Sequence, residues 1–594
     1  MISQALCISL WAISASAFWP GLSNEAHGAQ IPVLSPSAES VSATAELPFV
    51  DLGYTKHRAI SNPNPDLYKF QSIRYAAPPT GDLRFRAPQA PVDNPTGEVE
   101  DGRGRKECLQ AMVKWADTFP PEPCDDCECC EEDNNYGECH KPCDSGERGK
   151  EPPKQLFGGF QPAFNLKNPN LYSEDCLFLD VWTPKAAFDG KQKKPVLVWI
   201  YGGAYVFGGK SLYFPGGLMD RAMVNDRGGM IFVAMNYRMG ALGFAAGRDI
   251  EDKDINAGLL DQQKALQWVQ DHIDKFGGDP NQVTIVGLSA GGGSVLHHLT
   301  AYGGQKGALF QRAISLSGGW QPITDQTTAE STFREFMTKY NGVSTLADLR
   351  DLRKVSEAQM MEANLQQIQN APPGSFLYNP TAWGDFAPES PAKLLKNGEF
   401  LHDVQLILSH VFNEGGQFAK SFEDQGTTVP GFLDLAFPNV TKDEKEWILE
   451  TYHSGYNDAE DVAMIIGDAT FRCHVTYTSD AKSDQVWRQR WNTVHSRSHG
   501  GDLLYLFYQP FVPVASIRAA RILQDYVVTF VTSGNPTTTV TNPSGFRQPA
   551  PYHQYSMDNK VQFFDSGILR FPNVWRGDAE SEDLCRVWQQ MSCT

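Results

Sequence analysis

Residues 287–291 read Gly-Leu-Ser-Ala-Gly, which places a serine between two glycines on a sharp turn. The β-branched run 283–286 precedes this turn and is typical of a buried strand, and a helical pattern follows from Ser294. Side chains at positions 287 and 291 would collide in such a turn, so both positions favour glycine. The helix would direct free backbone N–H groups toward Ser289. The pattern favours Ser289 as a nucleophile over a Gly/Ser-rich turn without chemistry.

A serine nucleophile needs a base to take its proton and an acid to orient that base. Glu414 follows the strand-like run 404–408, and a carboxylate there can reach a histidine at the C-terminal edge of a sheet. Without further information the residues favour a different interpretation, in which Glu414 is one of 70 acidic residues and is simply solvated. The chain has 13 histidines, so these residues alone do not identify the one that acts as the base. His297 and His298 lie near Ser289 in sequence, but a helix would point them away from the turn.

The segments that must position these residues alternate between strand and helix. Fully apolar runs at 195–200 and 231–235 predict buried strands, and apolar residues at helical spacing predict a helix over 256–276. Gly-Gly-Asp-Pro at 277–280 ends that helix before the strand that leads to Ser289. This alternation predicts the α/β class, with a mostly parallel central sheet flanked by helices.

Residues 201–205, Tyr-Gly-Gly-Ala-Tyr, come directly after the first of these strands. Consecutive glycines at a strand end let backbone N–H groups converge on a small anion. Gly-Lys-Ser at 209–211 could end a phosphate-binding loop, but that motif needs glycine at position 204, where this chain has alanine. We therefore expect a loop that binds a small anion here, and not a nucleotide site.

Charge and composition narrow the function further. The 594 residues carry a net charge of −19, which argues against nucleic acid and anionic membranes as partners. Twelve cysteines, many of them clustered, indicate an oxidising compartment. No segment after the N-terminus approaches about 18 uninterrupted apolar residues, so we expect no stable membrane anchor. The oligomeric state is not indicated.

The N-terminus predicts secretion. A short apolar stretch ends in Ala15-Ser16-Ala17, which is typical of a signal peptide over 1–17. Residues 18–46 are rich in Ser, Ala and Pro and predict a disordered leader. The sequon at Asn439 permits N-glycosylation on the secretory route.

Residues 70–85 contain Ala-Ala-Pro-Pro followed by Gly-Asp-Leu-Arg-Phe. This stretch resembles the N-terminal signature of the type-B carboxylesterases, the family of cholinesterases, carboxylesterases and fungal lipases. The resemblance runs from about Phe49 to the C-terminus and includes 256–262 and 276–280. It implies an α/β-hydrolase fold, with a single domain over 47–594.

The resemblance also implies a catalytic site. Glu-Gly-Gly-Gln-Phe at 414–418 resembles the motif that holds the family's acid, which assigns that role to Glu414. His499-Gly500 resembles a His-Gly-x-acid segment before a late strand, which favours His499 as base, with His495 as the alternative. The expected oxyanion donors are the N–H groups of three residues, Gly203, Ala204 and Ala290. No metal or organic cofactor is implied.

Two disulfides follow from the same resemblance, Cys108–Cys176 and Cys473–Cys585. The first closes a loop that is the lid in fungal lipases, and here it is enlarged by a Cys-rich insertion at 122–145. This insertion contains Cys124, Cys127, Cys129, Cys130, Cys139 and Cys143. We expect these six cysteines to form three internal disulfides and not a zinc site, because thiols oxidise in a secreted protein and no second Cys-x-x-Cys pair follows. The insertion either restricts access to the site or is a passive decoration.

These features together predict a secreted carboxylic ester hydrolase that acts on a small-molecule or lipid ester through a Ser289–His499–Glu414 triad and an acyl-enzyme. Two alternatives stay open. One is an acyltransferase that uses the same triad. The other is an inactive binding or adhesion module of the same fold. Cys7 would leave with the signal peptide, and Cys593 is left over.

Overall fold

The computed structural model describes residues 47–62, 64–94, 97–114, 167–190, 192–224, 228–321, 326–372, 375–423, 428–453, 455, 457–482, 484–493, 497–510, 512, 514, 516–537, 560–565, 573–576 and 579–591. From Leu47 onward these residues group into one compact unit. None of the helices described here has the length and apolar character needed to cross a membrane.

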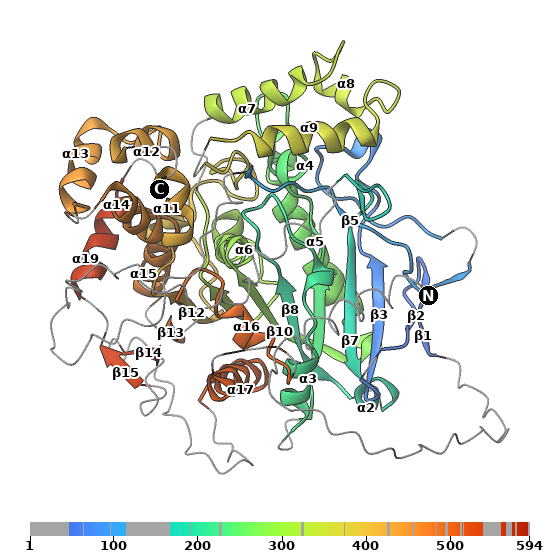
Figure 1. Ribbon diagram of the computed structural model, residues 1–594. Coiled ribbons are helices and arrows are strands. Elements are labelled where there is room, and N and C mark those ends of the chain that lie inside the picture. The colour runs from blue at the N-terminus through green and yellow to red at the C-terminus, as the bar shows by residue number, and fades with distance from the viewer. Residues whose placement is uncertain are drawn as a thin grey trace, which may run out of the picture. The chain divides into compact units, whose positions relative to one another are not determined.

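A ten-stranded sheet runs through the described residues (Figure 1). Neighbouring strands are parallel from β14 to β9 and antiparallel at both edges. In spatial order the strands are β15 (Asn573–Arg576), β14 (Lys560–Asp565), β13 (Val486–Asn492), β12 (Gln405–Val411), β11 (Arg312–Leu316), β10 (Gly278–Leu288), β8 (Lys194–Ile200), β9 (Ile231–Met235), β7 (Phe178–Pro184) and β3 (Leu67–Arg74). The prediction of a mostly parallel sheet is confirmed.

The central strands are buried on both faces, as expected for a parallel sheet covered by helices. Every residue of β9 is buried, and so is every residue of β8 after Lys194. Strand β10 lies between β8 and β11, with Val286 opposite Trp199 on one side and Ile314 on the other. The carboxyl ends of β8, β10, β12 and β13 therefore meet at one edge of the sheet, where the residues that follow them come together.

Helices α5, α6 and α17 pack on the sheet, whereas α7–α9 and α11–α15 form two further groups that are separate in Figure 1. The helices are α2 (Lys185–Asp189), α3 (Gly216–Met223), α4 (Gly240–Phe244), α5 (Ala257–His272), α6 (Ala290–Leu299), α7 (Gln326–Thr338), α8 (Leu346–Arg350), α9 (Glu357–Gln369), α10 (Pro391–Asn397), α11 (Gly416–Glu423), α12 (Val429–Ala436), α13 (Lys442–Thr451), α14 (Asp458–Ile466), α15 (Cys473–Ala481), α16 (Leu503–Leu506), α17 (Ile517–Ser533) and α19 (Ala579–Trp588).

Shorter elements complete the described chain. β1 (Phe49–Asp51), β2 (Lys56–Arg58) and β4 (Val99–Glu100) form a small sheet, and β5 (Glu107–Cys108) pairs with β6 (Tyr172–Ser173). Single 3₁₀ turns are η1 (Gly81–Leu83), η4 (Lys210–Leu212), η5 (Asp252–Asp254), η6 (Ile273–Phe276) and η7 (Ala301–Gly304). One π-helical turn, η8, spans Gly467–Arg472.

Two sequence-based boundaries differ from the structure. The helix expected over 256–276 ends at His272 and continues as a 3₁₀ turn, and the helix after Ser289 begins at once, at Ala290. The apolar residues that follow Asp502 form the short helix α16, in which the N–H of Leu506 donates to the carbonyl of Asp502 at 3.0 Å. A short apolar run fits a strand and a buried helical turn equally well.

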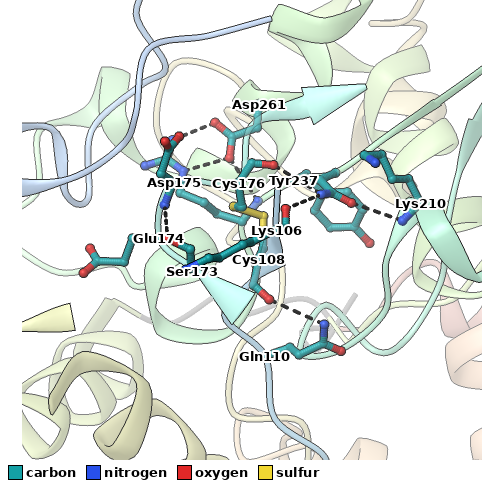
Figure 2. Close-up of a disulfide and its surroundings, with 12 residues drawn as sticks. Lys106, Cys108, Gln110, Ser173, Glu174, Asp175, Cys176, Lys210, Tyr237 and Asp261 are labelled. Atoms are coloured by element: carbon teal, nitrogen blue, oxygen red, sulfur yellow. Dashed lines mark hydrogen bonds and ion pairs between the residues drawn. A yellow bond between two sulfur atoms is a disulfide. The ribbon is translucent and has the colours of Figure 1, made fainter. Parts of the chain in front are cut away.

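The expected disulfide Cys108–Cys176 is present, with Cα atoms 4.9 Å apart, and both cysteines are buried (Figure 2). The Asn236 amide donates to the carbonyl of Cys176 at 3.3 Å. Lys210, from the excluded phosphate-loop motif, is buried, and its Nζ lies 2.7 Å from an oxygen of Asp180. That lysine is therefore held in an internal ion pair. The second expected disulfide, Cys473–Cys585, is also present.

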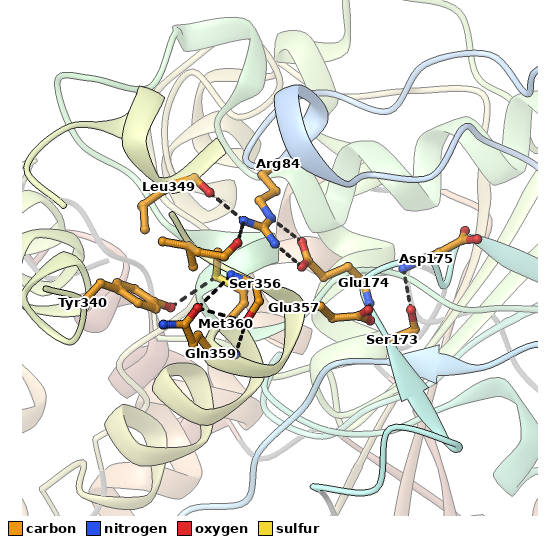
Figure 3. Close-up of polar contacts among 11 residues, drawn as sticks. Arg84, Ser173, Glu174, Asp175, Tyr340, Leu349, Ser356, Glu357, Gln359 and Met360 are labelled. Carbon is orange, nitrogen blue, oxygen red and sulfur yellow. Dashed lines mark hydrogen bonds and ion pairs between the residues drawn. The ribbon is translucent and has the colours of Figure 1, made fainter. Parts of the chain in front are cut away.

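A buried ion pair fixes the chain just before Cys176 (Figure 3). The Arg84 guanidinium donates to both carboxylate oxygens of Glu174, at 2.6 and 2.7 Å, and to the carbonyls of Leu349 and Val355, both at 2.7 Å. The N–H of Glu174 donates to the Glu357 carboxylate at the start of α9. The segment that leads out of the insertion is thereby attached to α8 and α9.

Several sequence predictions fall outside the described residues. They are the signal peptide at 1–17, the leader at 18–46, the cysteine cluster and insertion at 122–145, the alternative base His495, and Cys7 and Cys593.

Candidate active site

Ser289 occupies the turn between β10 and α6 with φ 58° and ψ −126°, a conformation that residues with a side chain rarely adopt. Three backbone hydrogen bonds hold it there. Its N–H donates to the carbonyl of Leu316 at 2.9 Å, and its carbonyl accepts from the N–H groups of Gly293 and Gly319 at 2.8 and 3.0 Å. The surrounding strands and helix thus maintain the strained turn, which presents the hydroxyl at the sheet's C-terminal edge.

Glycines around Ser289 permit three backbone segments to meet. A Cβ on Gly287 would lie 2.2 Å from the carbonyl oxygen of Gly291, and one on Gly291 would lie 2.1 Å from that of Ile200. A Cβ on Gly202 would lie 2.8 Å from the Cβ of Ser289. These approaches are too close for any side chain. They explain the glycines on both sides of the turn and bring the loop after β8 against Ser289.

His499 lies between Ser289 and Glu414. Its Nε2 is 2.7 Å from the Ser289 Oγ, and its Nδ1 is 2.6 Å from the Glu414 Oε2. Both the imidazole and the carboxylate are buried. With Nδ1 protonated and donating to the carboxylate, Nε2 is left as an acceptor for the serine hydroxyl. The structure therefore brings the three predicted residues into one hydrogen-bonded chain.

The loops that carry the acid and the base are joined through their backbones. Asn413 and Ser498, the residues just before Glu414 and His499, form an isolated parallel bridge. The N–H of Asn413 donates to the carbonyl of Arg497 at 2.8 Å. The second carboxylate oxygen of Glu414 accepts from the N–H of Val411 at 2.8 Å. Each oxygen of this buried carboxylate is thus held by a separate donor.

The three predicted oxyanion donors belong to two segments, the loop after β8 and the start of α6. Gly203 and Ala204 follow β8 with φ 127° and 53°, and Ala290 is the first residue of α6, where a helix leaves its N–H groups unused. Within the described part of the chain, these three N–H groups donate to no other atom. They are available to a negative oxygen near Ser289.

The histidines near Ser289 in sequence do not reach its hydroxyl. His298 Nε2 lies 3.0 Å from the Gln262 side chain, and His297 packs edge-on against Trp320. Burial lowers the pKa of each to about 3, so both stay neutral.

Three residues at the site carry no predicted role. The phenyl ring of Phe418, the last residue of the glutamate motif, lies 5.4 Å from the His499 ring, and that of Phe471 lies 4.4 Å from it. Asp502 is fully buried, and neither of its carboxyl oxygens has a well-formed hydrogen bond to a described residue. Burial raises the pKa of Asp502 to about 7, and the charge of Glu414 adds to this rise, whereas His499 opposes it. The sequence signalled Phe418 and Asp502 through the motifs that contain them, but it gave no signal for Phe471.

The arrangement contains a candidate nucleophile, a candidate base held by a carboxylate, and three N–H groups that no described residue uses. These are the parts that acyl transfer through a covalent intermediate requires. Among the residues described, no group of three or more His, Cys, Asp or Glu side chains is placed to hold a metal ion.

Comparison with known proteins agrees with this chemistry. The model of the carboxylesterase family matches residues 53–567. Carboxylesterase patB of Penicillium expansum is 31% identical over 586 residues, which cover 92% of this chain and 96% of patB. A secreted lipase of Arthroderma benhamiae is 31% identical over 73% of this chain and 86% of the lipase. The crystal structure of Aspergillus niger EstA matches with a TM-score of 0.71 at 25% identity, over 92% of this chain and 98% of EstA. The predicted α/β-hydrolase fold is confirmed.

Proposed function

Because this chain belongs to the carboxylesterase family, and is therefore a carboxylic ester hydrolase, we propose that it cleaves its ester through an acyl-enzyme formed on Ser289. The observation that carries this mechanism is the position of His499, with one ring nitrogen 2.7 Å from the serine oxygen and the other 2.6 Å from Glu414. A base in this position can take the serine proton as the bond to the substrate forms.

In the first half of the reaction the Ser289 Oγ attacks the ester carbonyl while its proton moves to Nε2 of His499. The negative charge that develops on the carbonyl oxygen is stabilised by the N–H groups of Gly203, Ala204 and Ala290. Glu414 stabilises the positive imidazolium. His499 then gives the proton to the departing alcohol, which leaves an acyl group on Ser289.

In the second half a water molecule gives a proton to His499 and attacks the acyl carbonyl. The same three N–H groups stabilise the second oxyanion. Collapse of this intermediate breaks the bond to Ser289, and His499 returns the proton to the serine oxygen as the acid is released. The charges balance in each half without a metal or organic cofactor.

A series of p-nitrophenyl esters of increasing acyl length tests this proposal. We expect release of p-nitrophenol by the native protein and none above background by Ser289→Ala. The preferred acyl length separates an esterase from a lipase. An active Ser289→Ala protein would contradict the mechanism.

An acyltransferase is the second candidate, because an alcohol can replace water in attacking the same acyl-enzyme. Product analysis with an added alcohol distinguishes the two: a hydrolase forms mainly the acid, and a transferase forms mainly the new ester. If the chain is instead an inactive binding module, we expect no turnover of any ester although Ser289 is present.

We also propose that the protein is secreted, with a signal peptide at 1–17, a leader at 18–46, one catalytic domain over 47–594 and a glycan on Asn439. The secreted lipase of Arthroderma benhamiae supports export, and so do the two disulfides. Asn439 is exposed, as a glycan requires. Mass spectrometry of the mature protein from culture medium would test the cleavage site and the glycan.

A further inference from the structure

A π-helical turn lies next to the catalytic histidine. The turn η8 joins α14 to α15, so that helical hydrogen bonding continues through it while one wider turn is inserted. Such turns are rare, often occur at functional sites, and change the direction of the side chains they carry. The side chain that η8 brings to the site is Phe471.

Phe471 packs directly on the base. Its ring centroid lies 4.4 Å from that of His499, with the planes at 44°, and it stacks on Phe418 at 5.7 Å and 17°. Phe418 in turn lies 5.4 Å from His499. Two hydrogen bonds fix the imidazole nitrogens, but they leave the ring free to tilt about the line that joins them. The two phenyl rings restrict that tilt by close packing.

The helical segment that carries Phe471 also contacts the residues next to the nucleophile and the acid. A Cβ on Gly319, whose N–H donates to the carbonyl of Ser289, would lie 2.2 Å from the Phe471 ring. A Cβ on Gly415, the residue after Glu414, would lie 1.8 Å from the carbonyl oxygen of Ala463 in α14. One segment, α14–η8, therefore contacts His499 and residues that adjoin Ser289 and Glu414.

The turn is connected to the C-terminal helix α19 by two links. The disulfide Cys473–Cys585 joins the residue after η8 to α19. On the other side, the Trp588 indole donates to the Tyr452 hydroxyl at 2.6 Å, and that hydroxyl donates to the Asp468 carboxylate within the turn at 2.8 Å. Figure 1 shows α19 beside α14 and α15, and α19 packs on both α15 and η8. All these linking side chains are buried.

We propose that Phe471 is a positioning residue for His499, and that the C-terminal helix maintains this position by holding the π-helical turn through Tyr452 and the Cys473–Cys585 disulfide. The inference rests on the proposed role of His499 as base. A ring that is free to tilt spends less time with Nε2 aligned on the serine hydroxyl, so the chemical step slows while substrate binding is unaffected.

Phe471→Leu tests the contact with His499, and Phe432→Leu is the matched control. Phe432 is an equally buried phenylalanine in the neighbouring helix α12, and it packs on Phe422 and Phe437. We expect Phe471→Leu to lower kcat about 10-fold with KM within about 2-fold, because a small misplacement of a reacting group slows the chemical step. Phe432→Leu should lower the melting temperature by about as much as Phe471→Leu does, and it should leave kcat unchanged.

Tyr452→Phe tests the link to α19, because it removes only the hydroxyl between Trp588 and Asp468. Its control is Tyr340→Phe, which removes a buried hydroxyl that contacts Met360 in another helical group. We expect a loss of about 3-fold in kcat for the first and none for the second, since a displaced turn misaligns the base only in part.

Each outcome decides the proposal. A wild-type kcat in Phe471→Leu, with Ser289→Ala inactive, overturns this inference and leaves the proposed function intact. Activity in Ser289→Ala overturns the function itself. If Phe471→Leu does not fold, Phe471→Met offers a flexible, unbranched side chain that can fill the site differently, and it tests the same contact. A kcat loss in Phe432→Leu equal to that in Phe471→Leu means that general loosening is the cause, which also overturns the proposal.

Discussion

Asn413 and Ser498 form a parallel backbone bridge although 85 residues separate Glu414 from His499, the residues that follow them. A main-chain contact therefore holds Glu414 and His499 near each other, in addition to the hydrogen bond between their side chains. This isolated bridge lies beyond the end of the β12–β13 pairing, in which Val411 lies opposite Trp491. The backbone thus limits the distance between the Glu414 and His499 side chains, so the hydrogen bond at Nδ1 of His499 has little freedom to change its length.

Ser289→Ala should abolish ester hydrolysis, with a loss of about 10⁴-fold or more, because no other group can form the acyl-enzyme. The hydroxyl contributes little packing, so the melting temperature should change little. Ser294→Ala in helix α6 is the control, since its hydroxyl donates to the carbonyl of Ala290 and accepts from the Gln262 amide. Labelling by an organophosphonate followed by peptide mapping should identify Ser289, and a label on another serine would refute this assignment.

Glu414→Gln should lower kcat by roughly 10²- to 10⁴-fold, because an amide can donate to Nδ1 and then favours the wrong tautomer of His499. His499→Ala should be at least as severe. The double variant should be no worse than His499→Ala alone, since the two residues act as a unit. Glu446→Gln, an exposed change, is the control. Effects that multiply in the double variant would mean that the two residues act independently.

Gly203→Ala should damage the site, whereas Ala204→Gly should be tolerated. At Gly203 φ is 127° and a Cβ would lie 2.1 Å from the carbonyl oxygen of Phe207, so the loop must move and its N–H with it. Loss of one oxyanion donor typically lowers kcat about 10²- to 10³-fold. At Ala204 φ is 53°, which glycine adopts easily, and the N–H is retained. Equal kcat values for the two variants would show that this loop does not stabilise the transition state.

Asp502 should make the protein less stable as the pH rises from about 4 to about 7. In the unfolded chain an aspartate releases its proton near pH 3.9, but burial raises the pKa of folded Asp502 to about 7. Between these two pH values Asp502 keeps its proton in the folded protein and loses it in the unfolded chain. The free energy of unfolding therefore falls as the pH rises, by an amount on the order of 4 kcal/mol. Below this interval both states hold the proton, and above it neither does.

Urea unfolding at several pH values measures this effect. Asp502→Asn has nearly the same shape and cannot ionise, so its free energy of unfolding should lack this fall. The exposed change Asp443→Asn should follow the wild-type curve. Parallel curves for wild type and Asp502→Asn would show that Asp502 does not retain its proton in the folded protein.

The sequence predicted the parts of the site that depend on local structure. The glycines around Ser289 and the apolar strands 195–200 and 231–235 follow from short-range sterics and burial, and both strands appear in the structure. Glu414 and His499 could be selected only through motifs, because neither charge nor spacing distinguishes them from the other acids and histidines. The contact of Phe471 with His499 had no local signal, since it depends on a π-helical turn and on tertiary packing.

Cys108 and Cys176 close a ring of the chain in which the two Cα atoms lie only 4.9 Å apart although 68 positions separate them. A protease that cuts the backbone once between these cysteines leaves both fragments joined through sulfur. The nicked protein would migrate as one species on a gel without reductant and as two species with it. The N-terminal fragment contains β3, the edge strand of the main sheet, and keeps its covalent link to the remaining strands. A cut in this segment therefore leaves every strand of the sheet within one covalent molecule.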